Sequence, residues 1–215
     1  MIKIISFKVC PFVQRVTALL EAKNVSFEVE FIDMENIPQW FAELSPNAQV
    51  PVMITEDGQT LFESEAIVEY IEEITPPIEA DVSPEQRAKD RAWGYQASNH
   101  YLIQCAALRS PDRETLAKTK EKLDEAFSKA EKELGSGPFF KGEKISNVDI
   151  AWLPLLHRAS LFQRYTCFDF LESFPKVKAW QEAIMKTGLV EKSVSRDFEE
   201  AFQSVYLMNK SFLES

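Results

Sequence analysis

The order of strand and helix patterns in the first third of the chain constrains the fold most. The patterns run strand 2–7, helix 11–23, strand 26–32, helix 38–44, a hairpin of 50–55 with 59–62, and helix 64–74. Two strands joined through a helix pair in parallel, whereas the strands of a tight hairpin are antiparallel. We therefore expect a mixed four-stranded sheet with helices packed on its faces.

Everything beyond the proline-rich, acidic stretch 75–84 is helical in pattern, with runs at 85–109, 112–134, 150–156, 176–186 and 196–212. Ser146 and Asp149 have the spacing of a capping box, which we interpret as structural. The fold prediction is a thioredoxin-like α/β domain at 1–76, a linker, and an all-α domain at 84–215.

Charge and composition exclude several function classes. The chain has 24 Lys and Arg against 34 Asp and Glu, and no basic run, which argues against nucleic-acid binding. The apolar start, 1–7, is too short for a signal peptide, and no stretch is long and uncharged enough to span a membrane, so we expect a cytoplasmic protein. Three cysteines and two histidines lie far apart, which favours free thiols and no metal site.

Cys10 is the candidate catalytic residue. It follows the first strand pattern and directly precedes Pro11 and the first helix, where free backbone amides and the helix dipole favour a thiolate with a depressed pKa. The alternative is a small cysteine that fills the strand–helix junction. Val13 occupies the position of the resolving cysteine in two-thiol oxidoreductases, so a mixed disulfide at Cys10 needs an external thiol. We interpret Cys105 and Cys167 as core or partly buried residues.

Two further places have alternative interpretations. Val50-Pro51 is either a simple strand entry or a cis turn that leaves the Val50 backbone free to pair with an extended ligand. Ser64 is a good helix N-cap, and with Glu63 it also suits the carboxylate and ammonium of an amino-acid head group.

Taken in order, these motifs resemble a known family. They are Cys10-Pro11-Phe12 with Arg15, Pro38-Gln39-Trp40-Phe41, Ser45-Pro46-Asn47, Val50-Pro51, Leu61-Phe62-Glu63-Ser64, Ile67 with Tyr70-Ile71, and Ser146 with Asp149. The set resembles cytosolic glutathione transferases of the omega-like, cysteine-containing group, over the whole chain.

This resemblance implies the glutathione transferase fold and a role for each matching residue. Cys10 would be the catalytic thiol, and Val50 would pair through its backbone with the cysteinyl part of glutathione. Pro51 would be a cis-proline, Glu63 and Ser64 would hold the γ-glutamyl end, and Phe12 would pack near the bound tripeptide. Ile37 departs from the family, which often has a basic residue there, so the contact of the glycyl carboxylate stays unassigned.

The resemblance also implies the activity. We expect a glutathione-dependent thiol transferase or reductase, with glutathione as co-substrate and no metal, that forms a mixed disulfide at Cys10 and also reduces dehydroascorbate. A homodimer that acts on a small hydrophobic or disulfide substrate follows from the same likeness. The aromatic candidates for the substrate site are Trp93, Tyr95, Tyr101 and Tyr206, which equally fit a helical core.

Two alternatives remain at this point. One is a non-catalytic interaction protein on the same fold, similar to the stringent-starvation proteins that bind RNA polymerase. The other is an ordinary conjugating transferase.

Overall fold

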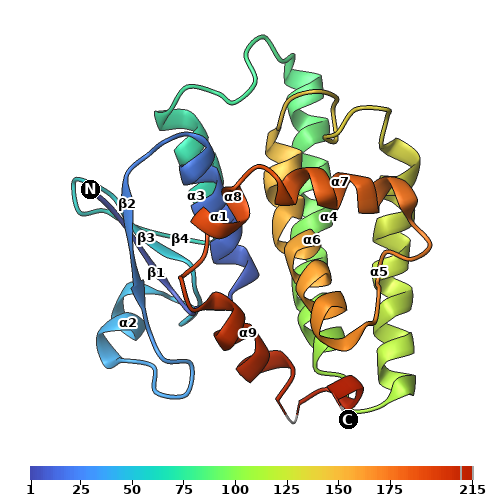
Figure 1. Cartoon of the computed structure of the whole chain (residues 1–215). Coiled ribbons are helices and arrows are strands. Elements are labelled where there is room, and N and C mark those ends of the chain that lie inside the picture. Colours follow the sequence, from blue (N-terminus) through green and yellow to red (C-terminus); the bar gives the residue numbers. More distant parts are fainter. Residues whose placement is uncertain (209, 215) are drawn as a thin grey trace.

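Figure 1 shows the computed structural model, which describes residues 1–208 and 210–214. Its strands are β1 (Ile2–Ser6), β2 (Phe27–Phe31), β3 (Val52–Ile54) and β4 (Thr60–Phe62). They form a single sheet in the order β2-β1-β3-β4, in which β1 pairs in parallel with β2 and antiparallel with β3. The β3–β4 pair is antiparallel, so the mixed sheet predicted from the patterns is confirmed.

Helices cover both faces of this sheet, and the alternation of side chains along the strands decides which face each residue joins. Ile4 and Met53 belong to the core beneath α1 (Pro11–Ala22) and α3 (Ser64–Ile74). The neighbouring positions Ile5 and Val52 instead pack with Phe41 of the short helix α2 (Gln39–Leu44) on the other face.

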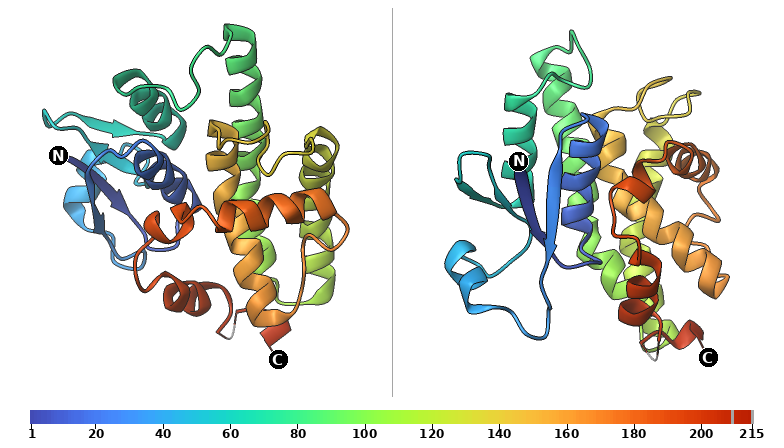
Figure 2. Two further views of the ribbon diagram at one scale, coloured as in Figure 1. Left: turned by 45° about the horizontal axis from the view of Figure 1, so that its top comes forward. Right: turned by 60° about the vertical axis from the view of Figure 1, so that its left-hand side comes forward.

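The rest of the chain is helical, as predicted. The helices are α4 (Pro84–Leu108), α5 (Arg113–Glu133), α6 (Asn147–Thr166), α7 (Pro175–Met185), α8 (Leu189–Lys192), α9 (Phe198–Tyr206) and the 3₁₀ turn η1 (Phe212–Glu214). Figures 1 and 2 show α4 and α6 side by side, with α1 on the side of α6 that faces the sheet. The core of this part is aromatic, with the rings of Trp152 and Trp180 5.5 Å apart.

Two helix predictions need correction. The helix α8 was not predicted, because four residues are too few to show a helical period. The pattern at 196–212 holds the shorter α9 and η1 rather than one helix, and residue 209 within it lies outside the described residues. Residue 215, the end of the predicted second domain, also lies outside them, and the division at 76 and 84 stays a prediction.

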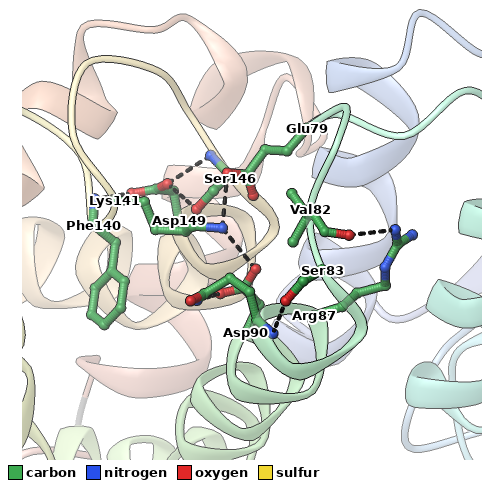
Figure 3. A network of polar contacts seen from close by, with 10 residues as sticks. Glu79, Val82, Ser83, Arg87, Asp90, Phe140, Lys141, Ser146 and Asp149 are labelled. Carbon is green, nitrogen blue, oxygen red and sulfur yellow. Dashed lines mark hydrogen bonds and ion pairs between the residues drawn. The ribbon is translucent and has the colours of Figure 1, made fainter.

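The start of α6 is fixed by the predicted capping box. Ser146 and Asp149 form it, and the Asp149 carboxylate accepts hydrogen bonds from the Ser146 N–H (2.7 Å), the Phe140 N–H (2.8 Å) and the Trp180 Nε1–H (2.7 Å). Figure 3 shows the bonds of this carboxylate to Phe140 and Ser146, and also the Lys141 ammonium, which bonds the Asp90 carboxylate at 2.8 Å. The motif joins α6 and α7 to the loop between α5 and α6, so its structural interpretation is confirmed.

In the part of the chain that the structure describes, every helix is too short or too polar to cross a lipid bilayer.

Candidate active site

Cys10 lies where the loop after β1 turns into α1. It is the N-cap residue of this helix, with Pro11 in the first helical position, where the missing amide of proline costs nothing. Its own N–H donates to the Phe7 carbonyl (3.2 Å), and its carbonyl accepts from the Gln14 N–H (3.1 Å). The residue is half-buried, so the thiol stands at the edge of the core.

The expectation of a depressed pKa at Cys10 is wrong in this structure. Burial raises the pKa of the thiol to about 11, because a thiolate loses its hydration where little water reaches the sulfur. The backbone amides of Val13 and Phe12 and the charge of Arg158 act in the predicted direction and lower this pKa. They are outweighed, so the helix start stabilises the anion without making it the resting form.

The other predicted site residues meet in one cavity of about 620 Å³ between the sheet and α4. Its lining includes Phe12, Val50, Pro51, Glu63 and Ser64. Residues 12, 50–51 and 63–64 come from three separate segments of the chain, so their convergence is a property of the fold.

Cys10 does not line this cavity. It lines a neighbouring one of about 120 Å³ together with Lys8, Gln14 and Ser193. Phe7 lines both cavities and therefore stands between them. The smaller cavity is bounded by a contact between the two parts of the chain, in which Lys8 Nζ pairs with the Asp197 carboxylate at 2.5 Å.

The peptide bond between Val50 and Pro51 is cis. Val50 lies two residues before the start of β3, and its backbone N–H and C=O have no hydrogen-bond partner among the described residues. Both groups belong to a residue that lines the cavity, which suits them to pair with an extended peptide-like ligand.

The start of α3 differs from the prediction in one detail. Glu63 is the N-cap residue, and Ser64 is the first residue of the helix, so the Ser64 hydroxyl is not a cap. Ser64 is buried and its hydroxyl has no hydrogen-bond partner in the described part of the chain, which leaves it free for a ligand. Glu63 has a φ of 68°, and Ala48, which also lines the cavity, has a φ of 49°. Such strained backbone is concentrated at functional sites.

The charged groups of the cavity are carboxylates. Glu65 forms an ion pair with Arg15 and accepts a hydrogen bond from the Ser98 hydroxyl at 2.8 Å, whereas Glu63 accepts only a long bond from Asn47 Nδ2 at 3.4 Å. No Lys, Arg or His is found among the described residues that line the cavity. Ile37 does not line it either, so the contact of a glycyl carboxylate remains unassigned.

Apolar side chains that the sequence did not single out complete the walls. Met34 and Leu102 line the cavity and are 52% and 65% exposed, which is typical of ligand-contacting aliphatic residues rather than core. Phe12 packs edge-to-face on Tyr101, with ring centroids 5.1 Å apart. Tyr101 and Tyr206 are buried, so the core interpretation of these two aromatic candidates is confirmed.

The remaining cysteines are not part of the cavity. Cys105 is buried and its sulfur lies 3.2 Å from the Tyr206 hydroxyl, as expected for a core residue. Cys167 is exposed, which corrects the prediction, because it ends α6 in a left-handed conformation with a φ of 61°. Within the described residues, no three His, Cys, Asp or Glu side chains are grouped closely enough to hold a metal ion.

Comparisons with known proteins agree with this geometry. The N-terminal domain family of glutathione S-transferases matches residues 9–74, and the C-terminal domain family matches residues 95–187. A glutathione S-transferase omega-1 from Sus scrofa is 29% identical over 97% of this chain and 87% of its own length. A probable cytosolic glutathione S-transferase DHAR1 from Oryza sativa subsp. japonica is 32% identical over 81% of this chain and 79% of its own.

A solved rice glutathione S-transferase in complex with glutathione has the same fold. Its TM-score is 0.79, with 24% identity over 98% of this chain and 97% of that one.

Proposed function

Because the chain belongs to the glutathione S-transferase family, we propose that it is a glutathione-dependent thiol transferase and reductase that acts through Cys10. The relatives with omega and DHAR names favour this reductive chemistry, including the reduction of dehydroascorbate. They favour an enzyme over the non-catalytic interaction protein.

The observation that carries the proposal is the placement of a single thiol at the start of α1 beside a cavity with unpaired groups for a peptide. The cavity offers the free backbone N–H and C=O of Val50 and the free hydroxyl of Ser64. We assign the cysteinyl part of glutathione to Val50, with Pro51 behind it, and the γ-glutamyl end to Glu63 and Ser64. Phe12 packs against the bound tripeptide.

The reaction consists of two thiol–disulfide exchanges. The Cys10 thiolate attacks the glutathionyl sulfur of a mixed disulfide, the S–S bond breaks, and the substrate thiolate leaves and takes up a proton. The thiolate of a second glutathione then attacks the Cys10–glutathione disulfide, which releases oxidised glutathione and restores Cys10. In sum, the mixed disulfide and one free glutathione thiol become a free substrate thiol and oxidised glutathione, so one disulfide bond breaks for each one that forms.

The proposal is tested by mass spectrometry after exposure to oxidised glutathione. We expect one glutathionyl adduct that maps to the peptide with Cys10, and no adduct at the buried Cys105. The exposed Cys167 is the internal control for non-specific reaction, because an unassisted surface thiol should form its adduct more slowly than Cys10. Modification of Cys167 alone would overturn the assignment.

The variant Cys10→Ser separates the reductive from the conjugating reaction. Reduction of a mixed disulfide should be lost, because a serine hydroxyl does not form the disulfide intermediate. Conjugation of glutathione to an aryl halide does not need that intermediate and should survive or rise. Full reductase activity in this variant would exclude the mechanism.

Location and assembly complete the proposal. We place the protein in the cytoplasm as a two-fold homodimer, without nucleic-acid partners, in line with its acidic charge and its family. Cell fractionation and sedimentation of the purified protein test these two points directly.

A further inference from the structure

Arg158 of α6 is a buried guanidinium that reaches across to the loop of Cys10. Its Nη2–H donates to the carbonyl of Val9, the residue before Cys10, at 2.8 Å. Its Nη1–H donates to Gln14 Oε1 at 2.5 Å, and the Gln14 N–H in turn donates to the Cys10 carbonyl. Arg158 thus holds the chain on both sides of the thiol.

The charge of Arg158 is not neutralised. The side chain is fully buried, and no carboxylate of the described residues forms an ion pair with it. Among the residues that the structure describes, its Nε–H has no hydrogen-bond partner, and the guanidinium carbon lies 5.5 Å from the ring centre of Phe198. A buried, unpaired charge is costly, so an opposite charge that forms close to it is strongly favoured.

Three other titratable groups around Cys10 carry no charge near neutral pH. Burial lowers the pKa of His157 to about 3, so this neighbour of Arg158 is a neutral imidazole. Burial raises the pKa of Tyr101 and of Tyr206 above its usual value, so both phenols stay protonated.

Two lysines, Lys8 and Lys192, line the cavity beside Cys10, but their charges act less on the thiolate than that of Arg158. Lys8 is 44% exposed and paired with Asp197, and Lys192 is exposed to solvent that screens its charge. Arg158 is therefore the one buried cation that faces Cys10 in the described part of the chain.

We propose that Arg158 is a positioning residue for the thiol-transfer reaction, whose unpaired guanidinium stabilises the negative charge on Cys10 Sγ while it fixes the loop that carries it. The inference rests on the proposed function, because it takes Cys10 as the reacting thiol. A purely structural role would need only the hydrogen bonds of Arg158 to Val9 and Gln14. The proposal adds that the positive charge of Arg158 stabilises the Cys10 thiolate.

The test is the alkylation of Cys10 by two reagents of similar size, neutral iodoacetamide and anionic iodoacetate, followed peptide by peptide in the full-length protein. The ratio of the two rates reports the potential at the sulfur, because access and thiolate population affect both rates alike. In Arg158→Met we expect alkylation by either reagent to slow on the order of tenfold, and the iodoacetate-to-iodoacetamide ratio to fall several-fold further.

Two further variants test the proposal if Arg158→Met does not fold. Arg158→Lys retains the charge without the forked hydrogen bonds and should keep a ratio close to that of the wild type. Gln14→Glu retains the acceptor 2.5 Å from Nη1 but neutralises the guanidinium, so its ratio should fall although the hydrogen bond remains. The matched control Arg164→Gln removes the same charge from the exposed end of α6, where Arg164 pairs with Glu199 at 2.9 Å, and should leave the ratio unchanged.

The outcomes separate the inference from the proposed function. An unchanged ratio in Gln14→Glu, or equal slowing of both reagents in Arg158→Met, would reduce Arg158 to a structural residue and overturn the inference. Absence of mixed-disulfide reduction in a wild-type protein whose ratio depends on Arg158 would instead overturn the proposed function alone.

Discussion

The neutral His157 at the junction of α1, α6 and α9 makes the stability of this protein depend on pH. Gln14 Oε1 accepts from Arg158, which fixes the orientation of the Gln14 amide and points its Nε2–H at His157 Nδ1, 2.9 Å away. A proton on Nδ1 would oppose this donor. The imidazole also stacks on Phe198, with ring centroids 5.1 Å apart, so a charged ring would find no acceptor within the described part of the chain and would meet little water.

Burial, with the charges of Arg158 and Arg164, lowers the pKa of His157 from 6.5 to about 3 in the folded protein. The unfolded chain therefore binds a proton at His157 that the folded chain does not bind. The free energy of unfolding falls as the pH drops below the pKa of His157 in the unfolded chain. From roughly neutral pH to about pH 5 this linkage lowers the free energy of unfolding by about 2 kcal/mol. Below that pH it falls further, by about 1.4 kcal/mol per pH unit, until the pH nears the pKa of His157 in the folded protein.

The measurement is urea denaturation at both pH values for the wild type and for His157→Asn, whose side-chain oxygen keeps an acceptor for Gln14. Carboxylates titrate alike in both proteins and cancel in the comparison. We expect the wild type to lose about 2 kcal/mol more than the variant between the two pH values. Equal losses would refute the reasoning, because they would mean that His157 takes up its proton in the folded state.

Four further substitutions test the fold and the cavity. Asp149→Ala leaves three buried N–H donors without an acceptor and should cost about 3–5 kcal/mol of unfolding free energy, measured by urea titration. Gly137→Ala should cost about 2 kcal/mol, because a Cβ there would lie 2.6 Å from the Gly142 backbone, whereas Gly135→Ala meets no atom within 4 Å and should be nearly neutral by thermal melting. Ser64→Ala should weaken glutathione binding about fivefold in calorimetry, since it removes the one free hydroxyl proposed for the γ-glutamyl end; unchanged affinity would exclude that contact.

The sequence predicts the sheet and the long helices because their periods repeat over enough residues to be distinct. The strand pattern of β1, the hairpin around Gly58 and the 21-residue α5 are such cases. The four-residue α8 shows no period, and it forms only because α1 and α7 offer it a surface to pack on. Its place is a tertiary property that local patterns do not contain.

The sequence identifies most residues of the candidate site, but it does not give the positions that they take in the fold. Local chemistry identifies Cys10, Val50-Pro51 and Glu63-Ser64, but the N-cap position of Glu63 follows from a backbone conformation that a glutamate seldom adopts. Arg158 was missed, although it is the one charged residue in a mostly apolar helical run, 150–162. That pattern could have identified Arg158, because an arginine is almost never fully buried unless it is paired.

The pKa of Cys10 shows why a local rule fails when burial is unknown. The amides of Val13 and Phe12 and the charge of Arg158 act on the thiolate as expected, but the rule that a helix start depresses a thiol pKa presumes a sulfur in water. Burial removes that water and raises the pKa, and by the same exclusion it strengthens every charge that still acts on the sulfur. A substitution that admits water to Cys10 should therefore lower the thiol pKa and at the same time shrink the effect of Arg158→Met. These two consequences have one cause, so an opened site in which Arg158 kept its full influence would contradict the electrostatic account.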